Sequence, residues 1–304
     1  MTTNINTDTF TPIAGIARSA ILVDLFIAVY SGRKQDKRTQ EEVTNAKGAA
    51  SKRAASVYKS LFAECRELDD INKFQARARQ MHYKLTLPWS DSGTRIIPVS
   101  EFTAYKETMS KYEEEFYDLV GAFLDKYDTL VAAAAFQLGT LFDRREYLTR
   151  EQVRNRFSFN VATSPLPTAG DFRLDIEAEV QQDLVDMYEK RMSDQVAKAN
   201  QDAWTRLYEV LARMSDRLTV DEDGKKRKFH DTLVSNAEEL CDLLTRLNVA
   251  GDPSLERARG RLQDALVGVS PDALRKEDST RTEVKQKVDA ILSDFDWGTT
   301  DDEE

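Results

Sequence analysis

The alternation of apolar and polar residues predicts a protein in which helices predominate over a few strands. Residues 20–30 are apolar and rich in β-branched side chains, interrupted only by Asp24, and predict a strand. Residues 157–161 alternate between apolar and polar positions and predict a second, half-buried strand. Residues 94–99 and 172–176 are shorter strand candidates. We therefore expect a small antiparallel or mixed sheet.

Two long segments carry apolar residues at every third or fourth position and predict long helices. The first covers residues 35–85, and the second covers residues 177–218, which contain no proline or glycine. A helix of the second length spans about 60 Å and projects beyond a compact domain unless it pairs with another helix. We expect the two to form a long antiparallel pair. Between them, residues 102–127 predict an amphipathic helix and residues 130–142 a buried one.

The remaining pattern predicts shorter helices and a division into segments. Thr149 is placed to cap a short helix, and further helices are predicted at residues 229–247, 255–267, 271–276 and 282–292. The expected fold class is α+β and mainly helical, with the sheet packed on helices. We expect a flexible N-terminus at residues 1–19, a strand–helix core at 20–175, the long helix with further helices at 176–267, and short helices with an acidic tail at 268–304.

Composition narrows the function classes. Charged residues make up 32% of the 304 positions, above the usual ~25%, which fits long solvated helices. No apolar run approaches the ~20 residues of a membrane span, and the first residues lack the basic start of a secretory signal. The two cysteines, Cys65 and Cys241, lie far apart in the sequence. This spacing argues against a disulfide framework and fits a reducing cytoplasm.

The sequence carries no recognisable catalytic motif. It has only two histidines, His82 and His230, and it lacks a phosphate-binding glycine loop, a zinc motif and a nucleophile motif. Both cysteines fall on apolar stripes and are interpreted as core residues. We therefore expect no enzyme activity, no metal and no cofactor.

Charge is distributed unevenly along this acidic chain, whose net charge is −10. Residues 31–60 hold eight basic groups against three acidic ones. Neutralisation of phosphates supplies most non-specific DNA affinity, so this segment predicts a polyanion site. The alternative is a solvated helix face whose acidic partners lie elsewhere in the fold. The basic residues are Arg33, Lys34, Lys37, Arg38, Lys47, Lys52, Arg53 and Lys59.

Binding of single strands also needs aromatic rings on which bases stack. The candidate rings are Tyr30, Tyr58, Tyr83 and Trp89, and the last lies in a polar turn where a ring is less easily buried. The basic track would be extended at the far end of the predicted helix by Arg77, Arg79 and Lys84. Core packing is the alternative for each ring. Residues 225–228 form a second basic patch, or only a solvated turn.

The C-terminus has the opposite charge. Residues 294–304 carry six acidic groups and no basic one, a composition typical of a disordered tail. In single-stranded-DNA-binding proteins such a tail competes with DNA for the basic groove and recruits partner proteins. Phe295 and Trp297 would fill the aromatic role in partner binding. The alternative is that the tail serves only for solubility.

Several stretches carry a family resemblance: residues 21–38, 82–95, 133–139, 164–173 and 231–244, among them His82-Tyr-Lys-Leu-Thr-Leu-Pro-Trp-Ser-Asp-Ser-Gly-Thr-Arg95. They resemble a largely phage-encoded family of uncharacterised proteins over roughly residues 20–260. That family resembles, or includes, the single-stranded-DNA-binding RNA polymerase cofactor of schitoviruses. The resemblance implies a fold unlike the oligonucleotide-binding barrel, a place in the host cell cytoplasm, and a role in transcription beside a phage RNA polymerase.

Charge pattern and resemblance together predict a sequence-tolerant single-stranded-DNA-binding protein that acts as a phage transcription cofactor. Its expected partners are single-stranded DNA, an RNA polymerase and further copies of itself, which would associate through apolar helix faces. The alternative is a helical adaptor for a MoxR-type ATPase module, because relatives occur near genes for such ATPases and for von Willebrand-type proteins. An adaptor needs no nucleic acid. A nucleic-acid enzyme is the third hypothesis.

Overall fold

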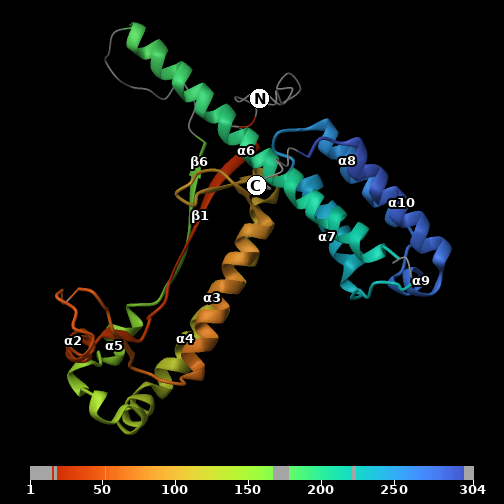
Figure 1. Cartoon of the computed structure of the whole chain (residues 1–304). Helices are drawn as coiled ribbons and strands as arrows, with labels where there is room; N and C mark the ends of the chain where they lie inside the picture. Colours follow the sequence, from red (N-terminus) through yellow and green to blue (C-terminus); the bar gives the residue numbers. More distant parts are fainter. Residues whose placement is uncertain (1–15, 17–18, 52, 167–177, 221–223, 298–304) are drawn as a thin grey trace. The chain divides into compact units, whose positions relative to one another are not determined.

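The computed structural model describes residues 16, 19–51, 53–166, 178–220 and 224–297 (Figure 1). Within these residues the chain is a mainly helical α+β protein with a four-stranded sheet and a separate two-stranded sheet. The predicted fold class, distinct from an oligonucleotide-binding barrel, is confirmed. The larger sheet has the order β4-β5-β1-β6, formed by Leu87–Pro88, Arg95–Pro98, Ala20–Ala28 and Ser158–Pro165. The smaller one joins β2 (Arg33–Gln35) to β3 (Tyr58–Ser60).

Helices make up most of the described chain. They are α2 (Lys37–Ala46), α3 (Arg66–Leu85), α4 (Val99–Leu138), α5 (Arg150–Arg154), α6 (Ala178–Leu218), α7 (Thr232–Leu247), α8 (Pro253–Leu266), α9 (Pro271–Lys276) and α10 (Asp278–Asp294). Thr149 caps α5 as predicted, because its hydroxyl accepts from the N–H of Gln152, whose side chain accepts in turn from the N–H of Thr149. The helices predicted at residues 177–218 and beyond are confirmed as α6 to α10. The strand candidate at residues 172–176 lies outside the described residues.

The chain divides into two compact units. Unit 1 comprises Met1–Asp24, Tyr83–Tyr105 and Thr163–Glu304, and unit 2 comprises Leu25–His82 and Lys106–Ala162. The boundaries fall inside β1, α3, α4 and β6. Each unit is therefore assembled from segments that lie far apart in the sequence.

Unit 2 is built on an antiparallel pair of helices, α3 and α4. Glu67 pairs with Lys126 at 2.6 Å, and further along α3 the ring of Phe74 lies 6.3 Å from that of Phe116. Because the position on α4 falls as the position on α3 rises, the two helices run in opposite directions. A long antiparallel pair is thus present, but its members are not the two segments predicted from the apolar spacing.

Aromatic rings fill the core of unit 2. Phe62 packs against Phe123, Tyr127 and Tyr147, with ring centroids 5.9, 5.6 and 5.4 Å away. The hydroxyl of Tyr147 donates to the carbonyl of Leu61 at 2.7 Å, and burial raises the pKa of that hydroxyl to about 12. Each such ring pair adds about 0.5–1.5 kcal/mol beyond its buried area. The chain that leaves β3 at Leu61 and Phe62 is therefore anchored in this core.

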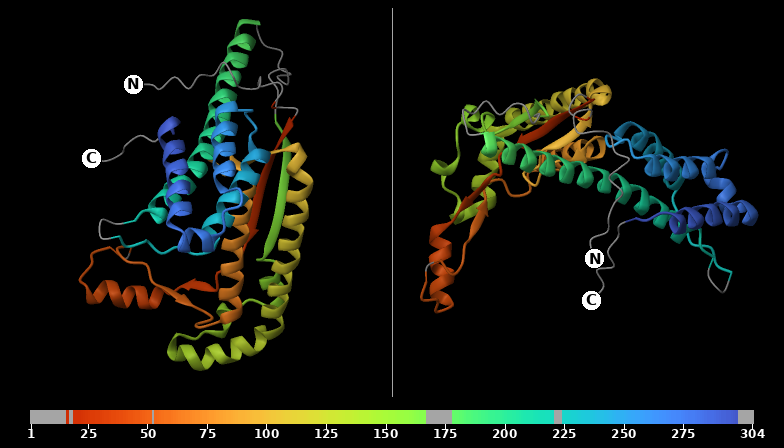
Figure 2. Two further views of the ribbon diagram at one scale, coloured as in Figure 1. Left: turned by 90° about the vertical axis from the view of Figure 1, so that its right-hand side faces the viewer. Right: turned by 90° about the horizontal axis from the view of Figure 1, so that it is seen from above.

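Unit 1 combines β4, β5 and the first part of β1 with helices α6 to α10. Ala20 to Val23 pair antiparallel with β5. Helix α6 packs against α10, α7, α8 and β4, and α8 packs against α7 and α10 (Figure 2). Arg206 on α6 donates to the carbonyls of Tyr83, Lys84 and Thr86 at 2.9–3.0 Å. These bonds satisfy carbonyls that the end of α3 leaves without a helical partner.

The prediction of one helix over residues 35–85 is wrong. Helix α2 ends at Ala46, and Gly48 follows with a φ of 63°. The described residues between Ala46 and Arg66 are not helical. Alanines in this stretch imitate the spacing of an apolar stripe, yet Ala50 and Ala54 are exposed. Because most helical stability in proteins comes from burying an amphipathic face, such a stripe does not maintain a helix.

Residues 130–142 are not uniformly buried, contrary to the prediction. Val131 and Ala134 are buried, but Phe136 is 93% exposed. The run continues α4, which joins the two helices predicted at 102–127 and 130–142 into one. Alanine favours a helix whether or not it is buried, so a run of alanines does not indicate burial.

Candidate nucleic-acid interface

Strands β2 and β3 present a polar and aromatic surface in unit 2. The Cα register pairs Arg33 with Ser60, Lys34 with Lys59 and Gln35 with Tyr58. Directly opposed residues share a face and successive residues alternate between faces, so Arg33, Gln35, Tyr58 and Ser60 lie on one side. All four are exposed, and Tyr58 is 63% exposed. The two strands form a long hairpin whose connection contains α2, and we call these four residues the hairpin face.

Two local features, a glycine before β2 and an aspartate after it, fix the position of the hairpin. Gly32 precedes β2 with a φ of 58°, and a Cβ there would lie 3.0 Å from a methyl group of Leu68, so glycine is required. After β2, the N–H of Asp36 donates to the carbonyl of Val57 at 2.9 Å. The Asp36 carboxylate also caps α2 by accepting from the N–H of Thr39, and this bond lowers the pKa of Asp36. The hairpin is thus fixed to α2 at one end and to the aromatic core at the other.

Exposed cations lie on β2, on α2 and in the segment between α2 and β3. Both views of Figure 2 show α2 and the hairpin projecting from the α3–α4 pair. Arg38 pairs with Glu42 at 3.3 Å where both side chains are largely exposed, an arrangement worth about 0–1 kcal/mol. Lys52 lies outside the described residues. The other exposed cations, none of which forms an ion pair with a described residue, are Arg33, Lys34, Lys37, Lys47 and Arg53.

A hollow of about 380 Å³ beside the hairpin is bordered by three cations and a ring. Arg33 and Lys34 line it from β2, Tyr30 from the end of β1, and Arg156 from the segment before β6. Arg156 is exposed, and its guanidinium has no ion pair or hydrogen bond with any residue that the structure describes. Burial raises the pKa of Tyr30, and the charge of Arg156 opposes that rise, which places the guanidinium near the phenol. We call this feature the cationic hollow.

Lys59, predicted as a DNA contact, has its ammonium enclosed by acceptors of unit 2. Its side chain is 10% exposed, and its ammonium lies 2.7 Å from a carboxylate oxygen of Glu146 and 3.7 Å from one of Asp36. It also donates to the carbonyl of Leu141 at 2.7 Å. Glu146 lines the cationic hollow. Because Lys59 neutralises this carboxylate, the hollow keeps its positive character.

Comparison with known proteins identifies a family. The family model described as "Protein of unknown function (DUF3150)" matches residues 18–229, which include the hairpin face and the cationic hollow. The chain belongs to this family. A search of the curated proteins and a search of the solved structures found no significant match. Membership of DUF3150 assigns no activity, so the function is inferred from the site.

The basic residues predicted to extend the DNA site along α3 form contacts with other residues of this DUF3150 protein. Arg77 pairs with Glu115 on α4, and Arg79 donates to a backbone carbonyl of β1 at 3.4 Å. Lys84 pairs with Glu239 at 2.9 Å and belongs to unit 1. These three residues are therefore not part of the cation group around the hairpin face.

The four candidate stacking rings differ in exposure and in the unit to which they belong. Trp89 is 4% exposed, so little of its ring is open to a stacking base. Tyr83 lies in unit 1, with the guanidinium of Arg95 4.9 Å from its ring centroid. Tyr30 is half-buried at the wall of the cationic hollow. Tyr58, on the hairpin face, is the candidate ring whose surface is most open to solvent.

The aromatic residues assigned to the acidic tail are packed inside unit 1. Trp297 is 7% exposed, with its ring centroid 5.3 Å from that of Trp204 and 5.6 Å from that of Tyr208. Phe295 is half-buried, 5.8 Å from Trp204. Contrary to the prediction, these rings do not extend from a tail. Residues 298–304 lie outside the described residues.

The sequence analysis missed Arg156, which the fold brings beside Arg33 and Lys34. Its local signal is the short basic run Arg150-Glu-Gln-Val-Arg154-Asn-Arg156. Arg154 is also exposed, whereas Arg150 pairs with Asp125. The signal was weak because two basic residues among polar neighbours are common on any surface.

Among the described residues, no group of three or more His, Cys, Asp or Glu side chains is placed to hold a metal ion. In that same part of the chain, none of the helices combines the length and apolar character required to cross a membrane.

Proposed function

We propose that this chain binds single-stranded DNA in a sequence-tolerant manner through the hairpin face and the cationic hollow. The observation that carries the proposal is an exposed cation and an exposed ring, Arg33 and Tyr58, on one face of β2–β3. They are diagonal cross-strand neighbours, a relation that sets Cα atoms about 7–8 Å apart. At that separation a guanidinium binds a phosphate while the ring stacks on the attached base.

Two energetic terms support single-strand binding. Release of counterions from phosphates supplies affinity that does not depend on sequence, and unpaired cations around the hairpin face provide it. Stacking of a base on an aromatic ring adds about 1–3 kcal/mol and tolerates every base. Gln35 and Ser60 add neutral donors and acceptors on the same face. Because paired bases are already stacked, Tyr58 favours a single strand over a duplex.

The finer proposal is that the protein acts in phage transcription as a cofactor of an RNA polymerase. It is supported by the resemblance of the sequence to the schitovirus cofactor, and it makes a polymerase and further copies of the chain the expected protein partners. The two proposals are independent in one direction, because DNA binding by the hairpin face does not require an RNA polymerase partner.

Fluorescence anisotropy with a labelled single strand of about 30 nucleotides, across a salt series and with duplex competitor, tests DNA binding. We expect single-strand preference and affinity that falls steeply with salt. The combined variant Arg33→Glu, Lys34→Glu and Lys37→Glu should lower the salt slope by roughly two units, because each phosphate contact on a single strand contributes about 0.7. Absence of binding at low salt overturns the proposal.

A matched control uses charge at another place in unit 2. Lys106 and Lys111 on α4 are exposed and have no ion pair with a described residue. Reversal of both charges should leave the salt slope within about half a unit of the parent. An equal loss in the control and in the hairpin variant would mean that overall charge, and not the hairpin face, governs binding.

A second function, that of a helical adaptor for a MoxR-type ATPase, is favoured by one observation. Phe136, in the alanine-rich end of α4, is 93% exposed. With the exposed alanines at positions 132, 133 and 135 it forms an apolar stretch of surface, and contiguous exposed apolar surface marks protein contact sites. An adaptor predicts that Phe136→Ser abolishes co-purification of an ATPase and that the parent chain shows no salt-dependent DNA binding.

A further inference from the structure

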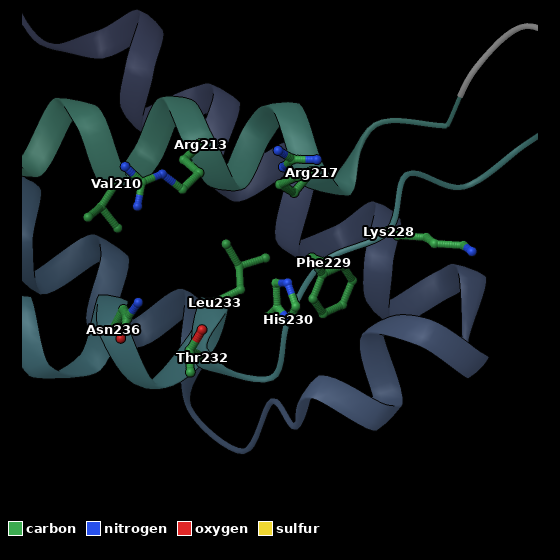
Figure 3. Close-up of a pocket in the computed structure, with 9 residues that line it drawn as sticks. All are labelled: Val210, Arg213, Arg217, Lys228, Phe229, His230, Thr232, Leu233 and Asn236. Atoms are coloured by element: carbon green, nitrogen blue, oxygen red, sulfur yellow. The ribbon is translucent and has the colours of Figure 1, made fainter. Parts of the chain in front are cut away.

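A second concave site lies in unit 1, between the end of α6 and the start of α7 (Figure 3). Its volume is about 530 Å³, within the roughly 300–1,000 Å³ of small-ligand sites. Val210, Phe229 and Leu233 form an apolar wall, and Thr232 and Asn236 add hydrogen-bonding groups. The described residues that line it include no carboxylate. We call it the α6–α7 pocket.

Cationic side chains border this pocket. Arg213 and Arg217 lie one helical turn apart on the same face of α6. Figure 3 shows both on the α6 side of the pocket, across from Leu233 and His230, while Lys228 extends outward from the loop before α7. The side chains of Arg213 and Lys228 form no ion pair or hydrogen bond with a described residue. Arg217 Nε lies 3.7 Å from a carboxylate oxygen of Asp216, where both side chains are about half exposed. The pocket therefore combines an apolar wall with positive charge that the surrounding chain leaves available.

A buried guanidinium behind the wall adds positive charge. Arg281 is 1% exposed, and its Cζ lies 5.6 Å from the ring centroid of Phe229. Within the described chain it donates only to backbone carbonyls, those of Arg217, Leu218, Arg227 and Leu274. The charge of Asp278 acts on Arg281, but no described carboxylate is hydrogen-bonded to this buried guanidinium, which favours an anion in the adjoining cavity.

The lining restricts the chemistry of the occupant. Two guanidinium groups one turn apart suit the oxygens of phosphate, which arginine binds in a bidentate manner. An inorganic anion would leave the apolar wall in contact with water. A purely aliphatic anion would make no use of the hydroxyl of Thr232 and the amide of Asn236. A ring with polar edges joined to phosphate satisfies all of these groups.

We propose that the α6–α7 pocket binds a nucleotide, with its phosphates at Arg213 and Arg217 and its base against Val210 and Leu233. The same chemistry is offered by a free nucleotide and by one nucleotide of a single strand. The pocket belongs to unit 1, whereas the hairpin face belongs to unit 2. The proposal therefore does not depend on DNA binding at the hairpin face.

Isothermal titration of the full chain with ATP tests the proposal, with inorganic tripolyphosphate as a second ligand. We expect saturable ATP binding and at least tenfold weaker binding of tripolyphosphate. Arg213→Glu should weaken ATP binding at least tenfold. Arg191→Glu is the matched control, because Arg191 is an exposed residue of the same helix without an ion pair to a described residue. It should bind ATP as the parent does.

Further variants separate folding from binding and identify the source of the nucleotide. Asn236→Asp places a carboxylate in the pocket at nearly constant volume, and it should weaken ATP binding without changing the melting temperature. A competing oligonucleotide that displaces ATP would make a DNA strand the source, and failure to compete would make it a free nucleotide. Equal binding of ATP and tripolyphosphate, or no ATP binding at millimolar concentration, overturns the proposal. Reversal of Arg33 and Lys34 should leave ATP binding unchanged, so the two proposals fail separately.

Discussion

The ammonium of Lys59 lies 2.7 Å from a carboxylate oxygen of Glu146. Both side chains are mostly buried, at 10% and 21% exposure, and Asp36 completes the group with an oxygen 3.7 Å from the same ammonium. Lys59 and Lys34 face each other in the strand register, yet only Lys59 is enclosed by carboxylates. The basic segment thus contains one structural lysine among exposed cations.

Lys59→Met should lower the free energy of unfolding by about 2–4 kcal/mol, because it leaves Glu146 and Asp36 without a counterion in a poorly solvated place. Denaturant unfolding measures this change. Lys47→Met is the control and should stay within about 0.5 kcal/mol, since Lys47 is exposed and unpaired in the described chain. The DNA salt slope of folded Lys59→Met should equal that of the parent. A lower slope would return Lys59 to the group of phosphate contacts.

Tyr58→Ala should weaken single-strand affinity by about 5- to 160-fold, corresponding to the loss of about 1–3 kcal/mol of stacking. Anisotropy at fixed salt measures the affinity, and the salt slope should not change because no phosphate contact is removed. Tyr58→Phe keeps the ring and should bind as the parent does. An equal loss in both variants would show that the hydroxyl, and not stacking, matters.

Arg156→Ala should have two linked effects. The DNA salt slope should fall by about 0.7, as for one phosphate contact on a single strand. The pKa of Tyr30 should rise above its already raised value, because the charge of Arg156 opposes the effect of burial. Nuclear magnetic resonance of carbon-labelled tyrosine rings follows that titration. A changed slope with an unchanged Tyr30 pKa would place Arg156 away from the cationic hollow.

The sequence correctly predicts the helices whose local features, such as caps and the absence of proline and glycine, are consistent with the surface that they bury. Residues 177–218 lack proline and glycine and form α6 (Ala178–Leu218), and Thr149 caps α5 as expected. The failure at residues 35–85 has a local origin, because exposed alanines continued the apolar spacing past Gly48. Periodicity counts apolar residues, whereas a helix is stabilised by the surface those residues bury.

The candidate site was only partly predictable because charge is local in sequence and its neutralisation is not. The basic segment is evident in composition, and the exposure of Arg33 and Lys34 agrees with it. The partners of Arg77 and Lys84 lie 38 and 155 residues away, at Glu115 and Glu239. No sequence spacing indicates such pairs, so the sequence could not separate neutralised cations from available ones.

The start of α8 depends on one buried carboxylate. Asp252 accepts from Trp204 Nε1 and Asn200 Nδ2 at 2.9 Å, and from the N–H groups of Ser254 and Leu255 at 2.8 and 3.2 Å. Burial raises the pKa of Asp252, but these four bonds to the ionised form outweigh it, so the pKa lies below its ordinary value. This stabilisation is complete above the unfolded pKa of about 3.9 and is lost as pH falls through the folded pKa.

Asp252→Asn should therefore lower the free energy of unfolding at pH 7 by about 1–3 kcal/mol. An asparagine replaces one of the two acceptor oxygens with an NH2 donor, so two of the four donors that now bond to Asp252 would lose their acceptor. The variant should also lose less stability than the parent as pH falls below the unfolded pKa of about 3.9, because only the parent loses the bonds to the ionised form. Denaturant unfolding at several pH values measures both effects. Asp264→Asn, at an exposed position of the same helix, is the control. Parallel pH profiles for parent and Asp252→Asn would contradict the assignment.

Tryptophan emission distinguishes stacking at Tyr58 from stacking at Trp89. All three tryptophans are buried, with Trp89, Trp204 and Trp297 at 4%, 8% and 7% exposure. We therefore expect blue-shifted emission, weak quenching by acrylamide, and little change when single-stranded DNA is added. Trp89→Phe should bind DNA with the affinity of the parent, because its ring is enclosed in unit 1. Strong quenching by DNA that disappears in Trp89→Phe would transfer the stacking role back to Trp89 and contradict its assignment to Tyr58.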